Sequence, residues 1–406
     1  MLLTATLCLL AGGAVMVYSA SAPAALTGGS GTSQLIRFVG YGLMGLVVLQ
    51  VVARIGLASI RRFTGPLLGL AFVLLIAVRM PGVGHASGTT AQRWLGVGPL
   101  QFEPSELMKL ALVLYAAHIF SSGRPGPRSV AIAFKRLLVV GGAGSLLVVS
   151  QPDLGTTLVI VFALLAIVLV AGVPARWLAI VAVVLAAGVV GFALINPYAG
   201  ARLTSFTDPW AHATTSGFQS VQSQIAIGSG GLFGRGPGQS LQKDYWLPEA
   251  PTDFILAVIG EELGFVGIAA LLFLYGLIAF AGMRAARRAK DAYATLIAVG
   301  VTAMILFQAV LNVFAVLGIA PVTGVPLPFV SYGASNLLVM LAGMGLLVNV
   351  AGGGAANIRA VRSTRERKPR RSGRERTSED RDRSRRDRGT RRPGAGGGRR
   401  PAGARG

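Results

Sequence analysis

Long apolar runs separated by short polar segments dominate the first 352 residues of the chain. Each run spans roughly 17 to 25 residues, the length that an α-helix needs to cross the hydrocarbon core of a bilayer. A transmembrane barrel would instead show short segments of alternating apolar and polar residues. The pattern predicts an all-α integral membrane protein with ten transmembrane helices, over residues 2–19, 36–54, 63–80, 104–121, 133–149, 155–172, 175–195, 254–283, 292–317 and 331–352.

The overall composition agrees with a membrane location. Hydrophobic residues make up 53% of the chain, charged residues only 13%, and the mean hydropathy is +0.63. These values lie outside the range of ordinary soluble domains. An alternative for the first apolar run is a cleaved signal peptide, because the small residues at 19–25 resemble a cleavage region. The basic segment that begins a signal peptide is missing, which favours a retained helix.

The net charge of +22 is concentrated in the C-terminal tail. Residues 359–406 hold 19 of the 38 basic residues and six acids, so this segment alone carries +13. A segment rich in Arg, Gly, Pro and Ser with almost no apolar residues is expected to be disordered. We therefore divide the chain into a membrane domain at 1–352 and a disordered basic tail at 353–406. The tail is expected to lie near anionic lipid headgroups or to dock on a protein, whereas nucleic-acid binding is disfavoured.

The remaining charges predict the topology. Basic residues gather in alternate connections, such as those containing Arg61, Arg128 and Arg284. The positive-inside rule then places these connections and both termini in the cytoplasm. Of the ten acids before the tail, only Asp291 lies in a predicted inner connection. This asymmetry predicts an extracytoplasmic functional site.

The longest connection is the predicted outer loop at residues 196–253, between helices seven and eight. Such long loops are uncommon unless they are functional or disordered. Apolar residues at helical spacing predict a short interfacial helix over 216–227 within it. The glycine-rich run at 228–240 is not expected to be regular helix. It indicates either a backbone that must approach something closely, with exposed amides beside Arg235 and Lys243 that would suit phosphate, or a flexible loop.

Asp253, where this loop enters the eighth helix, is the strongest candidate for chemistry. A cap of the helix is the alternative role for an acid at this position. Glu261 and Glu262 follow eight and nine residues later on the same span, where ionisable groups are costly and usually functional. They point about 100° apart, so at most one of them is expected to share a cavity with Asp253.

Three further ionisable residues lie at predicted helix starts or within helices. Glu106 and Lys109 are spaced to pair across one helical turn, either as a structural couple or as part of a substrate path. Asp153 is expected to cap the sixth helix. His85 and His212 have no neighbours at metal-ligand spacing, so no metal site is predicted.

Several motifs together resemble the SEDS peptidoglycan polymerases, the family that contains FtsW, RodA and SpoVE. The resemblance covers the chain from the first helix to Val350. The motifs that carry it are Arg-Trp-Leu-Gly at 93–96, Gln-Phe-Glu-Pro-Ser-Glu-Leu-Met-Lys at 101–109, Gln-Pro-Asp-Leu-Gly-Thr at 151–156, Asp-Pro-Trp at 208–210, Gly-Gln-Ser at 238–240, Leu-Pro-Glu-Ala at 247–250, Thr-Asp-Phe at 252–254, Gly-Glu-Glu-Leu-Gly at 260–264 and Pro-Leu-Pro-Phe-Val-Ser-Tyr-Gly at 326–333.

The chain departs from the usual family pattern at three places. Pro251 stands where His usually precedes Thr-Asp-Phe, Glu103 replaces a common Gln, and Gly-Ala-Ser-Asn occupies 333–336 in place of Gly-Gly-Ser-Ser. Pro251 removes a hydrogen-bonding partner beside Asp253, although Asp253 itself is retained.

The resemblance implies a peptidoglycan glycosyltransferase that polymerises lipid II outside the bacterial cytoplasmic membrane. Asp253 would act as the general base on the acceptor hydroxyl, in a reaction that inverts the donor sugar and releases undecaprenyl pyrophosphate. Residues expected to bind the substrate or stabilise the leaving group are Lys109, Arg202, Arg235, Lys243, Glu106, Asp153 and Glu262. No cofactor is required, although a divalent cation, Mg or Mn, is a candidate helper.

The resemblance also implies partners and leaves two alternatives open. The expected partners are a class B penicillin-binding protein, other division proteins and membrane lipids. The segment 259–264 is closer to the division enzyme FtsW than to the elongation enzyme RodA, which remains the alternative within the family. A lipid II flippase, with Glu106, Lys109 and Glu262 along its path, is the alternative from another functional class.

Overall fold

The computed structural model describes residues 1–22, 32–80, 82, 84–85, 92–97, 100–122, 126–195, 197–244 and 246–353. The predicted tail lies outside these residues, apart from Gly353.

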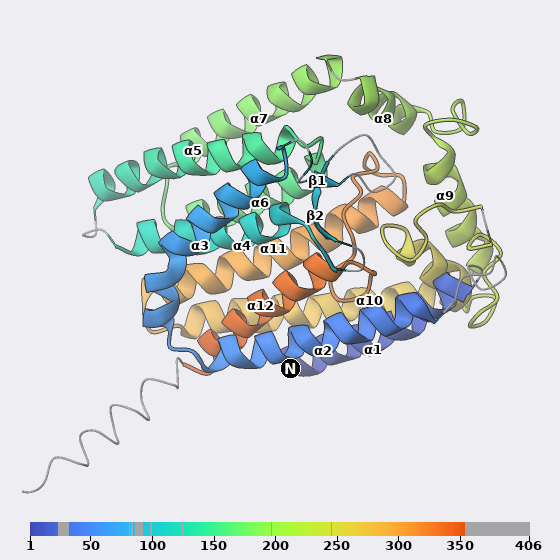
Figure 1. Ribbon diagram of the computed structural model, residues 1–406, viewed down its shortest axis with the longest axis horizontal. Helices are drawn as coiled ribbons and strands as arrows, with labels where there is room; N and C mark the ends of the chain where they lie inside the picture. Colours follow the sequence, from blue (N-terminus) through green and yellow to red (C-terminus); the bar gives the residue numbers. More distant parts are fainter. Residues whose placement is uncertain are drawn as a thin grey trace, which may run out of the picture. The chain divides into compact units, whose positions relative to one another are not determined.

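All ten helices predicted from the apolar runs are present (Figure 1). They are α1 (Leu2–Ser21), α2 (Ser33–Arg54), α3 (Leu57–Ala77), α4 (Pro104–Ser121), α5 (Pro127–Val149), α6 (Leu154–Val170), α7 (Ala175–Ile195), α10 (Ile255–Arg288), α11 (Ala292–Val316) and α12 (Ala334–Ala351). Within the described residues, seven of them are long and apolar enough to cross a membrane, namely α1, α2, α3, α5, α10, α11 and α12. Leu154–Val170 and Ala175–Gly188 are shorter apolar helices, and α4 carries the charged Glu106 and Lys109.

Three helix ends lie well outside the predicted bounds. Helices α3 and α5 begin six residues earlier than predicted, at Leu57 and Pro127, and α10 continues five residues further, to Arg288. The additional turns contain basic residues such as Arg61, Arg128 and Arg287. Hydropathy marks only the apolar part of a helix, whereas backbone hydrogen bonding continues into the polar region.

The loop between α7 and α10 contains two helices. The predicted interfacial helix is present as α9 (Phe218–Gly230), whereas α8 (Pro197–Thr207) was not predicted. Helix α9 includes the first three residues of the glycine-rich run, so the prediction that this run is not helical is wrong for 228–230. The helix ends where Gly231 adopts a positive φ of 55°. In Figure 1, α9 lies across one end of the helical bundle.

A small antiparallel sheet, also unpredicted, precedes α4. Its strands are β1 (Gly84–His85), β2 (Trp94–Val97) and β3 (Leu100–Phe102), in the order β1-β2-β3. Leu95 pairs with Gly84 on one side and with Phe102 on the other. The sheet leads directly into α4 and so fixes where that helix begins.

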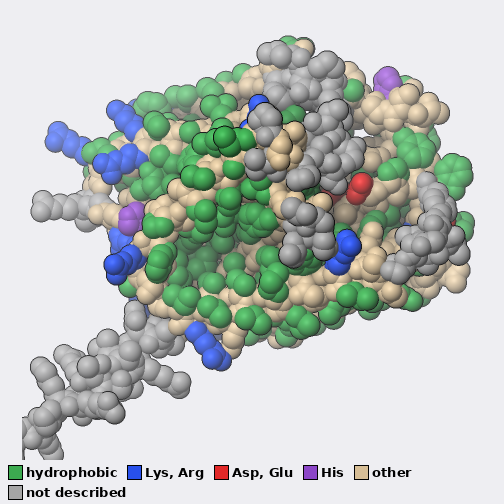
Figure 2. All heavy atoms as spheres, in the orientation of Figure 1, with side chains coloured by type: hydrophobic (Ala, Val, Ile, Leu, Met, Phe, Trp, Pro, Cys, Tyr) green, Lys and Arg blue, Asp and Glu red, His purple; other side chains and the backbone are tan. Residues whose placement is uncertain are grey.

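Helix α11 forms the centre of the bundle, where it packs against α4, α6, α10 and α12. In the most apolar 18-residue stretch of α11, 67% of the residues are buried inside the protein, whereas the corresponding share is 22% in α2 and in α3. The exposed flanks are apolar, and basic side chains gather mainly at the end where α2 meets α3 and α4 meets α5 (Figure 2). Polar residues buried in and around α11 therefore need internal partners.

Candidate functional site

Asp253 lies on the turn that leads into α10, two residues before the helix begins at Ile255. The N-cap position is Phe254, whose side chain makes no capping hydrogen bond. The Asp253 side chain is half-buried, and a Cβ atom added to Gly324 would lie 3.5 Å from its Oδ2 atom.

Two buried amides of α11 hold the backbone around Asp253. The Asn312 side chain donates hydrogen bonds to the carbonyl oxygen of Asp253 at 2.7 Å and to that of Val325 at 2.9 Å. Gln308, one turn earlier, donates to the carbonyl of Pro326 at 2.8 Å. The turn before α10 and the segment 321–326 are thus fixed to the same face of one central helix.

The turn at 151–155 packs on this segment from the other side. A Cβ atom on Gly155 would lie 2.2 Å from the Val325 side chain, so only glycine permits this approach. Asp153 is the N-cap of α6 and accepts a hydrogen bond from the Thr156 amide at 3.1 Å, which confirms its predicted capping role. Arg93 donates to the carbonyl of Gln151 at 2.8 Å. The motifs at 93–96 and 151–156 therefore form one structural unit.

Glu106 and Lys109 form the predicted pair on α4, with the Lys109 ammonium 2.8 Å from Oε2 of Glu106. Both residues are at most 2% exposed. Lys109 also donates to Oε1 of Gln308 at 2.7 Å, and Asn336 donates to Glu106 at 3.0 Å. Through Gln308, this neutralised cluster supports the segment that borders Asp253. One departure from the family pattern, Asn336, has a hydrogen-bonding partner within the cluster.

Glu103 stands immediately before α4 and is partly buried. Burial raises the pKa of Glu103 to about 8, and the carboxylates of Asp153 and Glu106 add to this rise. A hydrogen bond from Ser105 and the charge of Lys109 oppose it only partly. A protonated glutamate is neutral and can donate a hydrogen bond, as can the glutamine that is common in the family.

Glu261 joins the first part of α10 to the loop before it. Its carboxylate accepts hydrogen bonds from the Ser240 hydroxyl at 2.6 Å and from the amides of Leu241 and Gln242 at 3.1 and 3.2 Å. The Arg235 guanidinium lies 3.5 Å away and is 38% exposed. Glu261 is only 1% exposed, so its carboxylate oxygens find their hydrogen-bonding partners inside the protein.

Glu262 makes a second, separate attachment. It pairs with the Lys243 ammonium at 2.8 Å and accepts hydrogen bonds from the Ser19 hydroxyl at 2.6 Å and the Gly238 amide at 2.9 Å. Lys243 also donates to the Gly238 carbonyl at 2.7 Å and to Ser19 at 2.9 Å. The contact with Ser19 ties α1 to α10 and to the loop.

The close approach predicted for the glycine-rich run is made to α10. A Cβ atom on Gly230 would lie 1.9 Å from the Gly260 carbonyl, and one on Gly234 would lie 2.1 Å from the Glu262 carbonyl. Helix α10 is interrupted at Gly264, where φ is 66° and ψ is −163°. Because the helix is interrupted there, backbone groups near Gly264 can form hydrogen bonds with the glycine-rich run. For example, the backbone amide of Arg235 donates to the Glu261 carbonyl at 2.9 Å.

The predicted site residues thus fall into three groups. Asp253 stands at the turn where the motif segments converge, with Asp153, Glu106 and Lys109 in the packed layers behind it. Glu262, Lys243 and Arg235 belong to the attachment of the loop to α10. Arg202 lies in α8, but its side chain is outside the described part of the structure.

Gln308, Asn312 and Gly324 were missed from the sequence. Two amides four residues apart in an otherwise apolar span form a recognisable signal, since polar side chains in membranes usually face a functional interior. Gly324 gives no such signal, because its role follows from its proximity to Asp253. Within the described residues, no group of three His, Cys, Asp or Glu side chains is arranged to hold a metal ion.

Comparisons with known proteins agree with this arrangement. A family model for FtsW, RodA and SpoVE, described as cell cycle proteins, matches residues 1–353. Stage V sporulation protein E of Bacillus subtilis is 38% identical over 355 residues, covering 86% of this chain and 96% of the relative. A probable peptidoglycan glycosyltransferase FtsW of Geobacter sp. (strain M18) is 34% identical over 340 residues, covering 84% and 92%.

Solved structures show the same fold. A chain of a peptidoglycan synthase complex, described as coordinating polymerization and crosslinking, gives a TM-score of 0.71 at 30% identity and covers 87% of this chain and 97% of its own. The rod shape determining protein RodA of Thermus thermophilus gives 0.63 at 30% identity and covers 86% and 95%. The apolar helices and these matches together show a multi-pass, all-α membrane protein. The chain belongs to the FtsW/RodA/SpoVE family of cell cycle proteins.

Proposed function

We propose that this protein is a peptidoglycan glycosyltransferase that polymerises lipid II, with Asp253 as its general base. Relatives that match most of the chain are named probable peptidoglycan glycosyltransferases. Asp253 is assigned as the base because three segments of the chain meet at this residue. The turn before α10, the segment 321–326 and the turn at 151–155 meet there, fixed by Asn312 and by the close packing of Gly155.

Asp253 supplies what the reaction lacks, because a sugar hydroxyl is a poor nucleophile. The carboxylate takes the proton from the 4-hydroxyl of the acceptor N-acetylglucosamine as that oxygen attacks the anomeric carbon of the donor. The bond from this carbon to undecaprenyl pyrophosphate breaks in the same step, which inverts the anomeric configuration. A base on a firmly held turn needs little reorganisation to reach the proton. Asn312 fixes the backbone of that turn rather than acting on substrate.

The leaving pyrophosphate needs positive charge rather than an acid. The sequence predicted Lys109, Arg202, Arg235 and Lys243 as contributors, with Glu106, Asp153 and Glu262 as further substrate-binding residues. We assign this role to Arg235, whose side chain is 38% exposed, and a structural role to Lys109 and Lys243, which are buried in ion pairs with Glu106 and Glu262. We further propose that a divalent cation assists by neutralising the pyrophosphate.

We assign the enzyme to cell division rather than elongation, with a class B penicillin-binding protein and other division proteins as partners. The relatives named FtsW support the division role, and a solved peptidoglycan synthase complex supports a partner of this kind. A fluorescent fusion should then gather at midcell, and labelling along the lateral wall would favour elongation.

The proposed location is the bacterial cytoplasmic membrane, with both termini in the cytoplasm and Asp253 on the outer side. The gathering of basic side chains at one end of the bundle supports this orientation (Figure 2). Cysteines introduced at exposed positions and labelled from outside intact cells would test it.

The decisive assay for the function uses purified full-length protein and labelled lipid II. Wild type should form glycan polymer, and Asp253→Ala should reduce the rate at least about 100-fold. Asp244→Ala, which alters an exposed acid of the same loop, serves as the matched control and should retain activity. Polymerisation by Asp253→Ala at the wild-type rate would refute the assignment. Lipid II scrambling in vesicles without polymer would indicate the flippase instead.

A further inference from the structure

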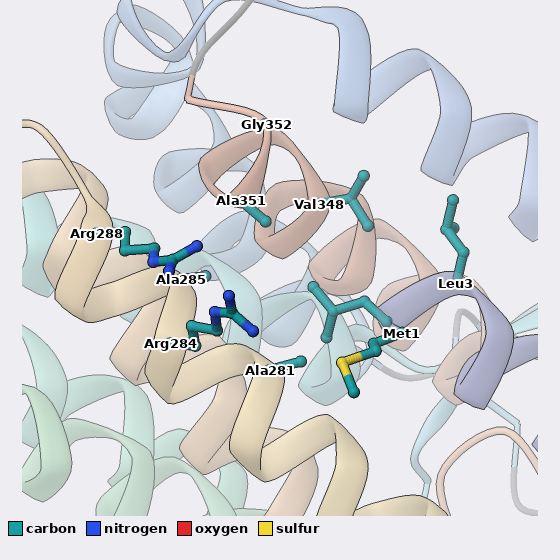
Figure 3. A pocket seen from close by; sticks show the side chains of 10 residues that line it. Met1, Leu3, Ala281, Arg284, Ala285, Arg288, Val348, Ala351 and Gly352 are labelled. Carbon is teal, nitrogen blue, oxygen red and sulfur yellow. The ribbon is translucent and has the colours of Figure 1, made fainter.

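A cavity of about 510 Å³ lies at the opposite end of α10 from Asp253. It opens to the surface and is bordered by the first turn of α1, the last turns of α10 and the end of α12 (Figure 3). Met1, Leu3, Val348 and Ala351 supply apolar walls, and Arg284 and Arg288 supply the charge. The proposed reaction uses none of these residues.

The two arginines share one face of α10 because they are four residues apart. Figure 3 shows both guanidinium groups extending from α10 toward the side where Met1 and Val348 lie. Both side chains are exposed, and neither has an ion pair within the described residues. Two like charges this close repel each other, so an anion bound between them would be stabilised by both.

The apolar walls narrow the choice of anion. Leu3 is 42% exposed and Leu7, one turn further along α1, is 48% exposed, so the apolar surface continues from the cavity along the flank of that helix. A free phosphate ion would contact the arginines but leave this surface uncovered. An anionic phospholipid satisfies both parts, because its phosphate can bind the arginines while its acyl chains lie along α1.

We propose that this cavity is a binding site for the phosphodiester headgroup of an anionic phospholipid, held by Arg284 and Arg288. The bound lipid joins the ends of α1, α10 and α12. Because it binds the folded protein, it stabilises that state by an amount that rises with the logarithm of the free lipid concentration once this exceeds Kd.

Native mass spectrometry of the full-length protein in detergent tests the proposal, with phosphatidylglycerol and phosphatidylcholine as probes. Wild type should retain phosphatidylglycerol at concentrations about tenfold lower than phosphatidylcholine. Arg284→Ala/Arg288→Ala should weaken phosphatidylglycerol retention about tenfold. The control Arg287→Ala/Lys290→Ala removes the same charge from exposed residues outside the cavity and should change retention less than about twofold. Equal losses in both variants would reduce the effect to general surface charge and overturn the proposal.

A second variant tests the cavity without changing charge. Ala351→Phe fills it from the exposed end of α12 and should also weaken phosphatidylglycerol retention, with an unchanged unfolding midpoint in lipid-free detergent as evidence of folding. Unchanged retention would contradict binding in the cavity. Inorganic phosphate should compete only at far higher concentrations than a short-chain phosphatidylglycerol. Equal competition would identify a site for a free anion and refute the lipid assignment.

Discussion

The carboxylates at the start of α10 lie in two contrasting environments. Glu261 and Glu262 are each 1% exposed, and together they accept hydrogen bonds from the loop, from Ser19 and from Lys243. Asp253, only eight residues before Glu261, lies half-buried on a turn whose backbone is fixed by Asn312. The three acids therefore differ in role although they look equivalent in the sequence. Glu261 and Glu262 hold the loop against α10, whereas Asp253 lies on the turn where the motif segments meet.

The largest effect on stability is expected when the Glu262–Lys243 pair is broken on one side. Glu262→Gln leaves the buried Lys243 ammonium without its counterion, which should cost about 3 to 5 kcal/mol. Lys243→Met/Glu262→Gln removes both charges, keeps an acceptor oxygen for the Gly238 amide and places an NH2 group beside the Ser19 hydroxyl, which can accept from it, so it should recover most of that loss. Chemical unfolding of the purified protein in detergent measures both. A single variant as stable as wild type would show that the pair contributes no stability.

Gly264→Ala tests the attachment of the loop through the backbone. Gly264 has a φ of 66°, and an added Cβ would lie 2.3 Å from the Gly234 amide nitrogen, so the loop must shift. We expect a loss of about 2 to 3 kcal/mol in the same unfolding measurement. Gly276→Ala, on the same helix with open space around it, is the control and should be neutral or slightly stabilising. Equal behaviour of the two variants would argue against a tight approach.

Asn312→Ala tests the other side of the comparison. It removes the hydrogen bonds to the carbonyls of Asp253 and Val325, which should cost about 1 to 2 kcal/mol of stability. The polymerisation rate should fall about tenfold because the base is positioned less accurately, with little change in KM. Val310→Ala, at an exposed position of the same helix, should leave the rate unchanged. A rise in KM at constant rate would instead indicate that Asn312 contacts substrate.

The smallest effect concerns Glu103 and pH. Its folded pKa of about 8 lies above the ordinary value of 4.5, so its contribution to stability is complete below pH 4.5 and is lost as pH rises toward and through 8. Glu103→Gln removes this dependence and should gain about 1 kcal/mol relative to wild type between pH 6 and pH 9, after allowance for partial exposure. Unfolding curves across this range measure the difference. Parallel pH profiles would exclude a shifted pKa at Glu103.

The sequence predicted the helices well because each apolar run reports directly on burial in lipid. Helix ends were less accurate at α3, α5 and α10, because charged residues continue a helix beyond the apolar region. The sheet at 84–102 was missed, since strands of two to four residues carry too little pattern to distinguish them from turns.

The candidate site was predicted in part. Asp153 as a cap and Glu106 with Lys109 as a pair follow from local spacing alone, and both interactions are present. The attachment of Glu261 and Glu262 to residues 235–243 depends on a loop that folds back on α10, which no local pattern reveals. The role of Asn312 likewise appears only when α11 is seen beside the turn at Asp253.

The most direct test of this account compares Asp253→Asn with Lys243→Met/Glu262→Gln in one single-turnover assay with lipid II. If Asp253 is the base and Glu262 is structural, Asp253→Asn should unfold like wild type but polymerise at least about 100-fold more slowly. The charge-neutral double variant should keep a rate within about tenfold of wild type. A folded Asp253→Asn protein with wild-type activity, or a folded but inactive double variant, would contradict the account.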